Sequence, residues 1–81
     1  MYQVQPTVKA IERMGFHPYI RNIGGKEYVA VSAEYGDDAA DYYGEYRGGY
    51  PWINPKLERL AEQKKAYWEW ENPGSLTLFP V

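Results

Sequence analysis

The sequence predicts an α+β domain in which two helix–β-hairpin units form a four-stranded antiparallel sheet with two main helices on one face. Three observations favour this fold class. Helical periodicity occurs twice, each time directly before a pair of short strand-like segments. Each pair is joined by a short turn rich in glycine or proline. The 81 residues suffice for a single domain, residues 1–81, and contain no cysteine, so packing rather than disulfide bonds must stabilise it.

The first predicted helix follows Thr7, which we expect to cap it. Val8, Ile11 and Met14 recur at helical spacing and form one apolar stripe, and the glycine at position 15 is well placed to end the helix. Upstream of the cap, residues 2–4 are a candidate for a short additional strand. If they join the sheet, it has five strands instead of four.

Residues 16–23 and 26–33 are predicted to form the first hairpin, because Gly24-Gly25 is a typical two-residue hairpin turn. This turn pairs Arg21 with Tyr28. The face expected to meet the core then carries Phe16, Pro18, Ile20, Val29, Val31 and Ala33. The opposite face carries His17, Tyr19, Arg21 and Tyr28. A slip of one residue would mix the two sets, which supports this register.

The second unit begins at Asn54-Pro55, where asparagine caps a helix and proline occupies its first position. Its apolar stripe consists of Leu57, Leu60 and Ala61. Strands are predicted over residues 67–71 and 76–79, with Trp68 and Trp70 on one face and a type II turn over residues 72–75. The helices share the fragments Ile11-Glu12-Arg13-Met14 and Leu57-Glu58-Arg59-Leu60. They indicate either a duplicated unit or a recurrent way of building small α+β domains.

An acidic, tyrosine-rich connector, residues 34–53, joins the two units. Residues 34–45 include five acids and no base, and residues 34–50 hold five of the nine tyrosines. Asp37 is expected to cap a short helix over residues 38–46. Tyrosine is favoured at binding surfaces, and carboxylates attract basic partners. The predicted partner-binding residues are Glu34, Tyr35, Asp37, Asp38, Asp41, Tyr42, Tyr43, Glu45, Tyr46 and Tyr50. The alternative is a solvated connector whose tyrosines cover the sheet.

A small, acidic, cysteine-free and aromatic-rich chain with the cluster Asp37-Asp38 to Glu45-Tyr46 resembles phage- and plasmid-encoded inhibitors of the anti-CRISPR and anti-restriction type. The resemblance lies in size, charge and style, and it includes no diagnostic motif. It implies a non-enzymatic inhibitor that docks on a basic, nucleic-acid-binding site of a partner protein and mimics nucleic acid there. The net charge of −2 restricts such mimicry to a local patch.

The sequence predicts no catalytic centre, metal site or cofactor. His17 is the only histidine, and no cysteine is present to share a metal with it. Asp37, Asp38 and Asp41 lack the ligand spacing of a calcium loop. No apolar run reaches the length of a membrane span and no signal peptide is evident, so we expect a cytoplasmic protein without a membrane partner.

Two other functions fit the sequence. Tyr19, Arg21 and Tyr28 on the outer face of the first hairpin could stack on nucleic-acid bases, with Lys26 and Arg13 nearby. The acidic net charge argues against this direct binding. The chain could also serve as an accessory subunit of a larger complex.

Overall fold

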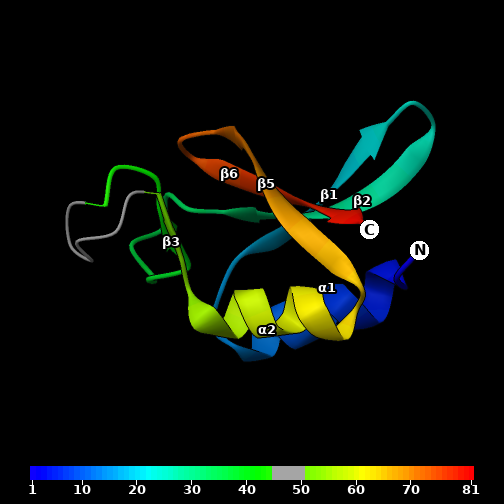
Figure 1. The fold of residues 1–81 in the computed structure, drawn as a ribbon, viewed down its shortest axis with the longest axis horizontal. Helices are drawn as coiled ribbons and strands as arrows, with labels where there is room; N and C mark the ends of the chain where they lie inside the picture. Colours follow the sequence, from blue (N-terminus) through cyan, green and yellow to red (C-terminus); the bar gives the residue numbers. More distant parts are fainter. Residues whose placement is uncertain (45–50) are drawn as a thin grey trace.

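The computed structural model describes residues 1–44 and 51–81 and has the predicted α+β architecture (Figure 1). The elements are α1 (Val4–Arg13), β1 (Pro18–Ile23), β2 (Lys26–Ser32), β3 (Ala40–Asp41), β4 (Trp52–Ile53), α2 (Pro55–Gln63), β5 (Ala66–Asn72) and β6 (Ser75–Pro80). Both helices lie together along one face of the main sheet in Figure 1. Among the described residues, no helix has the length and apolar character needed to cross a membrane.

The main sheet has the strand order β1-β2-β6-β5, and all of its pairs are antiparallel. The second strand of each hairpin therefore lies at the centre, and the first strand of each hairpin forms an edge. A duplicated helix–hairpin unit would produce this order, and the duplication stays a prediction. β3 and β4 form a separate two-stranded sheet within the connector.

The predicted register of the first hairpin is confirmed, with Arg21 opposite Tyr28. Gly24 and Gly25 have φ angles of 59° and 82°, the conformation that makes glycine the favoured residue in such turns. Val29 and Val31 are buried as predicted. Ile20 is 39% exposed, so its assignment to the core was wrong. β1 is an edge strand, and its hairpin projects past the helices in Figure 1.

The predicted start of the first helix was wrong. α1 begins at Val4, which also removes the candidate fifth strand over residues 2–4. Thr7 lies inside the helix, where its buried Oγ1 donates a hydrogen bond to the carbonyl oxygen of Gln3 at 2.6 Å. Tyr2 explains the earlier start, because its buried hydroxyl group is hydrogen-bonded to the main sheet and fixes the chain just before the helix.

The second helix begins as predicted, since the Asn54 side-chain oxygen accepts a hydrogen bond from the Lys56 amide at 2.9 Å. The predicted stripe is buried against the sheet. Trp68 joins this core, and its Nε1 donates to the Leu57 carbonyl oxygen at 2.8 Å. The buried apolar side chains from both units form one cluster: Tyr2, Ile11, Phe16, Val29, Val31, Ala39, Leu57, Leu60, Ala61, Ala66, Trp68, Leu76 and Leu78.

The second hairpin differs from its prediction at the turn. Gly74 does not have the positive φ angle that a type II turn requires. The Asn72 side-chain oxygen instead accepts a hydrogen bond from the Gly74 amide at 2.8 Å. An irregularity between Trp70 and Asn72 places Trp70 opposite Leu76.

The predicted connector helix is wrong over the residues that the structure describes. Asp38 has a φ angle of 64°, and β3 pairs with β4 where a second helical turn was expected. Asp37 accepts a hydrogen bond from the Ala39 amide, which forms a local turn instead of a helix cap. Ala39 is buried in the core, so the connector is anchored to the domain. The end of the predicted helix, residues 45 and 46, lies outside the described residues.

Candidate functional site

The start of the connector is folded against His17, which directly precedes β1. The imidazole ring of His17 stacks on the ring of Tyr35, with centroids 3.8 Å apart and planes 12° from parallel. His17 Nδ1 lies 2.8 Å from Asp37 Oδ2. Because a carboxylate only accepts hydrogen bonds, the Nδ1 proton is donated to Asp37. These two contacts fix the positions of Tyr35 and Asp37 relative to the sheet.

Two of the predicted binding carboxylates hold the connector in shape. The Asp37 side chain is only 15% exposed, and its second oxygen accepts a hydrogen bond from the Ala39 amide at 3.1 Å. Asp41 Oδ1 accepts a hydrogen bond from the Gly44 amide at 3.0 Å. Because these oxygens already accept hydrogen bonds from backbone amides, they are less available to a partner.

The connector is also tied to the second unit. The Asn54 side-chain amide donates a hydrogen bond to the Asp38 carbonyl oxygen at 3.0 Å, so the residue that caps α2 also holds the loop. The Ala33 amide donates to the Gly74 carbonyl oxygen at 2.8 Å. The carboxyl group of Glu34 lies beside Gly74, close enough to clash with an added Cβ atom. The connector is thus held by both hairpins.

Within the part of the connector that the structure describes, four side chains with charged or aromatic groups are exposed. Tyr35 and Tyr43 are 62% and 61% exposed. Glu34 and Asp38 are exposed carboxylate residues. We call these four residues, Glu34, Tyr35, Asp38 and Tyr43, the connector surface.

Tyr42 differs from its neighbour, because its ring packs edge-on against the ring of Trp70 with a centroid distance of 5.2 Å. It also makes an edge contact with Tyr43, with centroids 5.4 Å apart. Tyr42 therefore joins the connector to β5, while Tyr43 extends from it. Three further predicted binding residues, Glu45, Tyr46 and Tyr50, lie outside the described residues.

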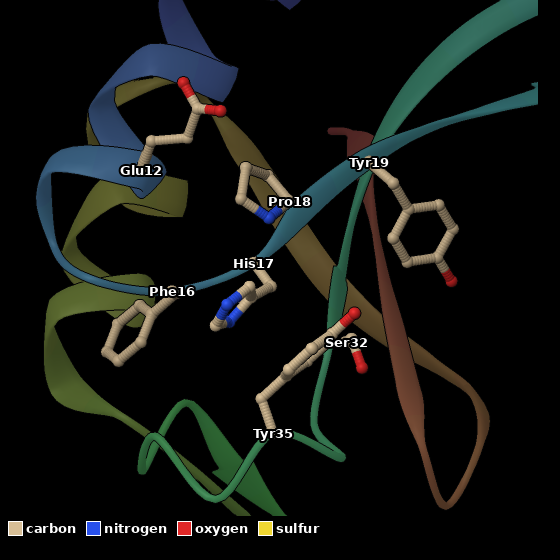
Figure 2. A pocket seen from close by; sticks show the side chains of 7 residues that line it. All are labelled: Glu12, Phe16, His17, Pro18, Tyr19, Ser32 and Tyr35. Carbon is tan, nitrogen blue, oxygen red and sulfur yellow. The ribbon is translucent and has the colours of Figure 1, made fainter.

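A pocket that the sequence did not predict lies between α1, the start of β1 and the connector. Its volume is about 440 Å³, and its lining residues are Glu12, Phe16, His17, Pro18, Tyr19, Ser32 and Tyr35. Figure 2 shows Glu12 on α1 at one end, with Tyr35 from the connector and Tyr19 from β1 toward the other. No lysine or arginine is among the described residues that line this pocket. We call it the Glu12–Tyr35 pocket.

The pocket was missed because its walls come from three separate parts of the chain. The hairpin register places His17 beside Ser32, as the hydrogen bond from the Ser32 amide to the His17 carbonyl oxygen shows. The contact with Asp37 spans 20 residues and has no local periodicity. The only signal in the sequence was a solitary histidine and an acidic residue just beyond the end of the same hairpin.

Nucleophilic and metal-assisted chemistry each need specific contacts among polar groups such as those around the pocket. His17 and Asp37 are arranged as a histidine–carboxylate pair, but in the described part of the chain no hydrogen bond joins the Ser32 hydroxyl group to the His17 ring. A nucleophilic serine needs such contact with its base. Within residues 1–44 and 51–81, no group of three or more His, Cys, Asp or Glu side chains is placed to hold a metal ion.

The outer face of the main sheet is the other candidate site. Tyr28, Phe79 and Tyr67 form an aromatic row with centroid separations of 5.1 and 6.0 Å. Arg21 donates a hydrogen bond to the Thr77 hydroxyl group at 3.0 Å and forms an ion pair with Glu71. The arginine charge on this face is thus largely balanced within the protein.

Comparison with known proteins does not extend this description. No protein-family model, curated protein or solved structure matches the chain.

Proposed function

We propose that this protein is a non-enzymatic binding protein that docks its connector surface on a basic surface of a partner protein. The observation that carries the proposal is the exposure of Tyr35 and Tyr43, at 62% and 61%, on a backbone fixed by hydrogen bonds. Each of these rings makes an aromatic contact within the protein, and most of its surface remains in solvent. Tyrosine is among the residue types that contribute most to protein–protein affinity.

The contacts that hold the described part of the connector support this function. Ordering a flexible loop on binding costs free energy, which reduces affinity. Here Asp37 and Asp41 bind nearby amides, and Asn54 binds a connector carbonyl group. Tyr35 is held by its stack on His17. Part of the ordering cost is therefore met during folding, and a partner meets a preformed surface.

The charge of the connector surface favours a basic partner. Glu34 and Asp38 are exposed beside the two tyrosines, and the whole chain has a net charge of −2. Complementary charge increases the association rate and disfavours acidic partners. The most concrete form of the proposal is docking on a nucleic-acid-binding site in the cytoplasm, as in the inhibitors that the chain resembles. Because Asp37 and Asp41 bind the protein's own backbone, any mimicry of phosphates is local.

A matched pair of double variants tests the proposal. Glu34→Lys with Tyr43→Ser changes the connector surface, and Glu62→Lys with Tyr67→Ser makes the same changes on exposed positions of α2 and β5. Partners captured by the unaltered chain are identified, purified and titrated with each variant. We expect the connector variant to bind at least about tenfold more weakly, because truncating a tyrosine that acts as an interface hot spot costs about 2 kcal/mol or more.

The control variant should keep the original affinity, and circular dichroism should show that both variants are folded. Equal affinity of both variants for every captured partner would rule out the connector surface as the docking site. Competition with an oligonucleotide then tests the more specific form. If the partner binds nucleic acid and this chain at the same time, its nucleic-acid site is not the target.

Direct nucleic-acid binding by the outer sheet face is the second candidate. The exposure of Tyr19 and Tyr67, at 40% and 46%, favours it. The ion pair between Arg21 and Glu71 opposes it, because the positive charge that a phosphate group would bind is already paired with a carboxylate. Salt-dependent binding of short single strands would support this candidate, and its absence at low salt would remove it.

A third candidate function is that of an accessory subunit of a larger complex. Such a subunit would bind its complex through the same connector surface that we propose for docking.

A further inference from the structure

We infer that the Glu12–Tyr35 pocket accepts the guanidinium group of an arginine side chain from the partner. This inference rests on the proposed function, since Tyr35 belongs both to the connector surface and to the pocket. The pocket volume of about 440 Å³ is ample for one long side chain. What selects the occupant is the chemistry of the walls.

One end of the pocket is negatively charged. Glu12 lies in the last turn of α1, where the helix dipole adds partial negative charge. It is exposed and has no ion-pair partner among the residues that the structure describes. The neighbouring Arg13 is not among the residues that line this pocket, and it lines a separate hollow on the α1 surface with Lys9. A cation entering the pocket therefore meets a carboxylate that has no other charged partner.

The remaining walls are rich in aromatic rings. Phe16, His17, Tyr19 and Tyr35 all line the pocket (Figure 2). Cations are attracted to the faces of such rings. The stack between His17 and Tyr35 holds both rings in place before a ligand arrives. The hydrogen bond between His17 Nδ1 and Asp37 also fixes the orientation of the imidazole ring.

These groups fit arginine better than lysine. A guanidinium group is planar, so it stacks on aromatic rings, and its forked N–H groups match a carboxylate such as that of Glu12. An ammonium group is more strongly hydrated and loses more on entering a pocket lined by rings. The lining places Glu12 from α1 apart from Tyr19 and Tyr35, and a long side chain with a polar end is the kind of group that could contact both (Figure 2).

The test uses blocked amino acids with the full 81-residue chain. Nα-acetyl-arginine methylamide is titrated while backbone and ring chemical shifts are followed by nuclear magnetic resonance. The corresponding citrulline compound has nearly the same shape but no charge. The lysine compound has the positive charge but lacks the planar guanidinium group. We expect saturable shifts at Tyr19 and Tyr35 with the arginine compound, weaker binding of the lysine compound and no binding of the citrulline compound.

Two variants locate the site. Glu12→Gln removes the charge and keeps the size, and Glu62→Gln makes the same change on the exposed surface of α2. Loss of one charge contact at a partly exposed site should weaken binding about threefold to fivefold in Glu12→Gln and leave Glu62→Gln unchanged. Equal binding of the arginine and citrulline compounds, or equal affinity of both variants, overturns the inference.

The outcome is separate from that of the proposed function, because the probes bind the chain without a partner. If the connector variant loses its partner but the arginine probe does not bind, the docking proposal stands and the pocket inference fails. If the probe binds as expected but the connector variant binds every captured partner as tightly as the control variant does, the pocket is an arginine site and the docking proposal fails.

Discussion

The hydroxyl group of Tyr2 links the two hairpins through the backbone of Val29 and Leu78. It accepts a hydrogen bond from the Val29 amide at 2.9 Å and donates one to the Leu78 carbonyl oxygen at 2.5 Å. β2 and β6 pair only over Ala30 to Ser32 of β2, so Val29 lies just beyond their ladder. Tyr2 supplies the hydrogen bonds at the point where the strands separate.

Replacing Tyr2 with phenylalanine tests this link. The ring stays, but the Val29 amide and the Leu78 carbonyl oxygen lose their partner in a buried place. An unsatisfied buried polar group costs about 1–3 kcal/mol, so the free energy of unfolding should fall by that amount in urea titrations. Tyr67→Phe removes an exposed hydroxyl group and should change stability by less than about 0.5 kcal/mol. Equal effects of the two variants would show that the hydrogen bonds of Tyr2 do not stabilise the fold.

Tyr2 also predicts an alkaline limit to stability. Burial raises the pKa of Tyr2 above the ordinary tyrosine value of 10.0, the nearby Tyr28 raises it further, and the hydrogen bond with Val29 opposes the rise. The unfolded chain therefore loses this proton first as the pH rises. The stabilisation is complete below pH 10.0 and is lost between that value and the higher pKa of the folded state. Unfolding free energies measured from about pH 8 to about pH 11 should fall more steeply for the unaltered protein than for Tyr2→Phe.

Asn54 has two roles that substitution can separate. Its side-chain oxygen caps α2 at Lys56, and its side-chain amide binds the Asp38 carbonyl oxygen. Asn54→Asp keeps the capping oxygen and loses the amide donor, whereas Asn54→Ala loses both. We expect Asn54→Ala to lower stability by about 0.5–2 kcal/mol, with Asn54→Asp between it and the unaltered protein. An Asn54→Ala protein as stable as the original would contradict both roles.

Two glycines should differ in their tolerance of alanine. Gly25 has a φ angle of 82°, a conformation that costs other residues about 1–2 kcal/mol, so Gly25→Ala should be destabilising by about that amount. Gly74 has no positive φ angle, and the atoms nearest to an added methyl group belong to the side chain of Glu34, an exposed residue that can change rotamer. Gly74→Ala should therefore change stability by less than about 0.5 kcal/mol. Thermal melts of the two variants provide the comparison.

The His17 contacts predict a local effect on the connector. His17→Phe retains a ring that can stack on Tyr35 but removes the hydrogen bond to Asp37, and His17→Ala removes both contacts. The amide of Ala39 reports the change, because it is hydrogen-bonded to Asp37. Its hydrogen exchange should be about fivefold to tenfold faster in His17→Phe, the effect of losing about 1 kcal/mol, and faster still in His17→Ala. Unchanged exchange in both variants would show that His17 does not hold the connector.

Two features encoded by adjacent residues were predicted correctly. Gly24-Gly25 determines its hairpin register through the turn that it forms, and Asn54-Pro55 starts α2 through a contact two residues away. The start of α1 depends instead on Tyr2 and Leu78, which are 76 positions apart. No local pattern contains that contact. Aspartate is a residue type that often caps helices, but the hydrogen bonds of Asp37 with His17 and Ala39 stabilise a turn instead.

The candidate site was only partly predictable for the same reason. Composition drew attention to the connector, where the structure shows Tyr35 and Tyr43 exposed. Composition could not separate these rings from Tyr42, which packs on Trp70, because all three are tyrosines in one acidic stretch. Nor could it show that Asp37 lies against His17, since the hairpin between them determines that contact.

The burial of Ala39 has a consequence for the lifetime of the protein. Because this residue belongs to the common core, the connector cannot detach without disturbing the fold. A partner bound to the connector would therefore stabilise the entire domain by mass action, by about 2.7 kcal/mol at a hundredfold excess of its concentration over the dissociation constant. Unbound copies would open more often and be degraded sooner. Cellular abundance would then follow the supply of the partner.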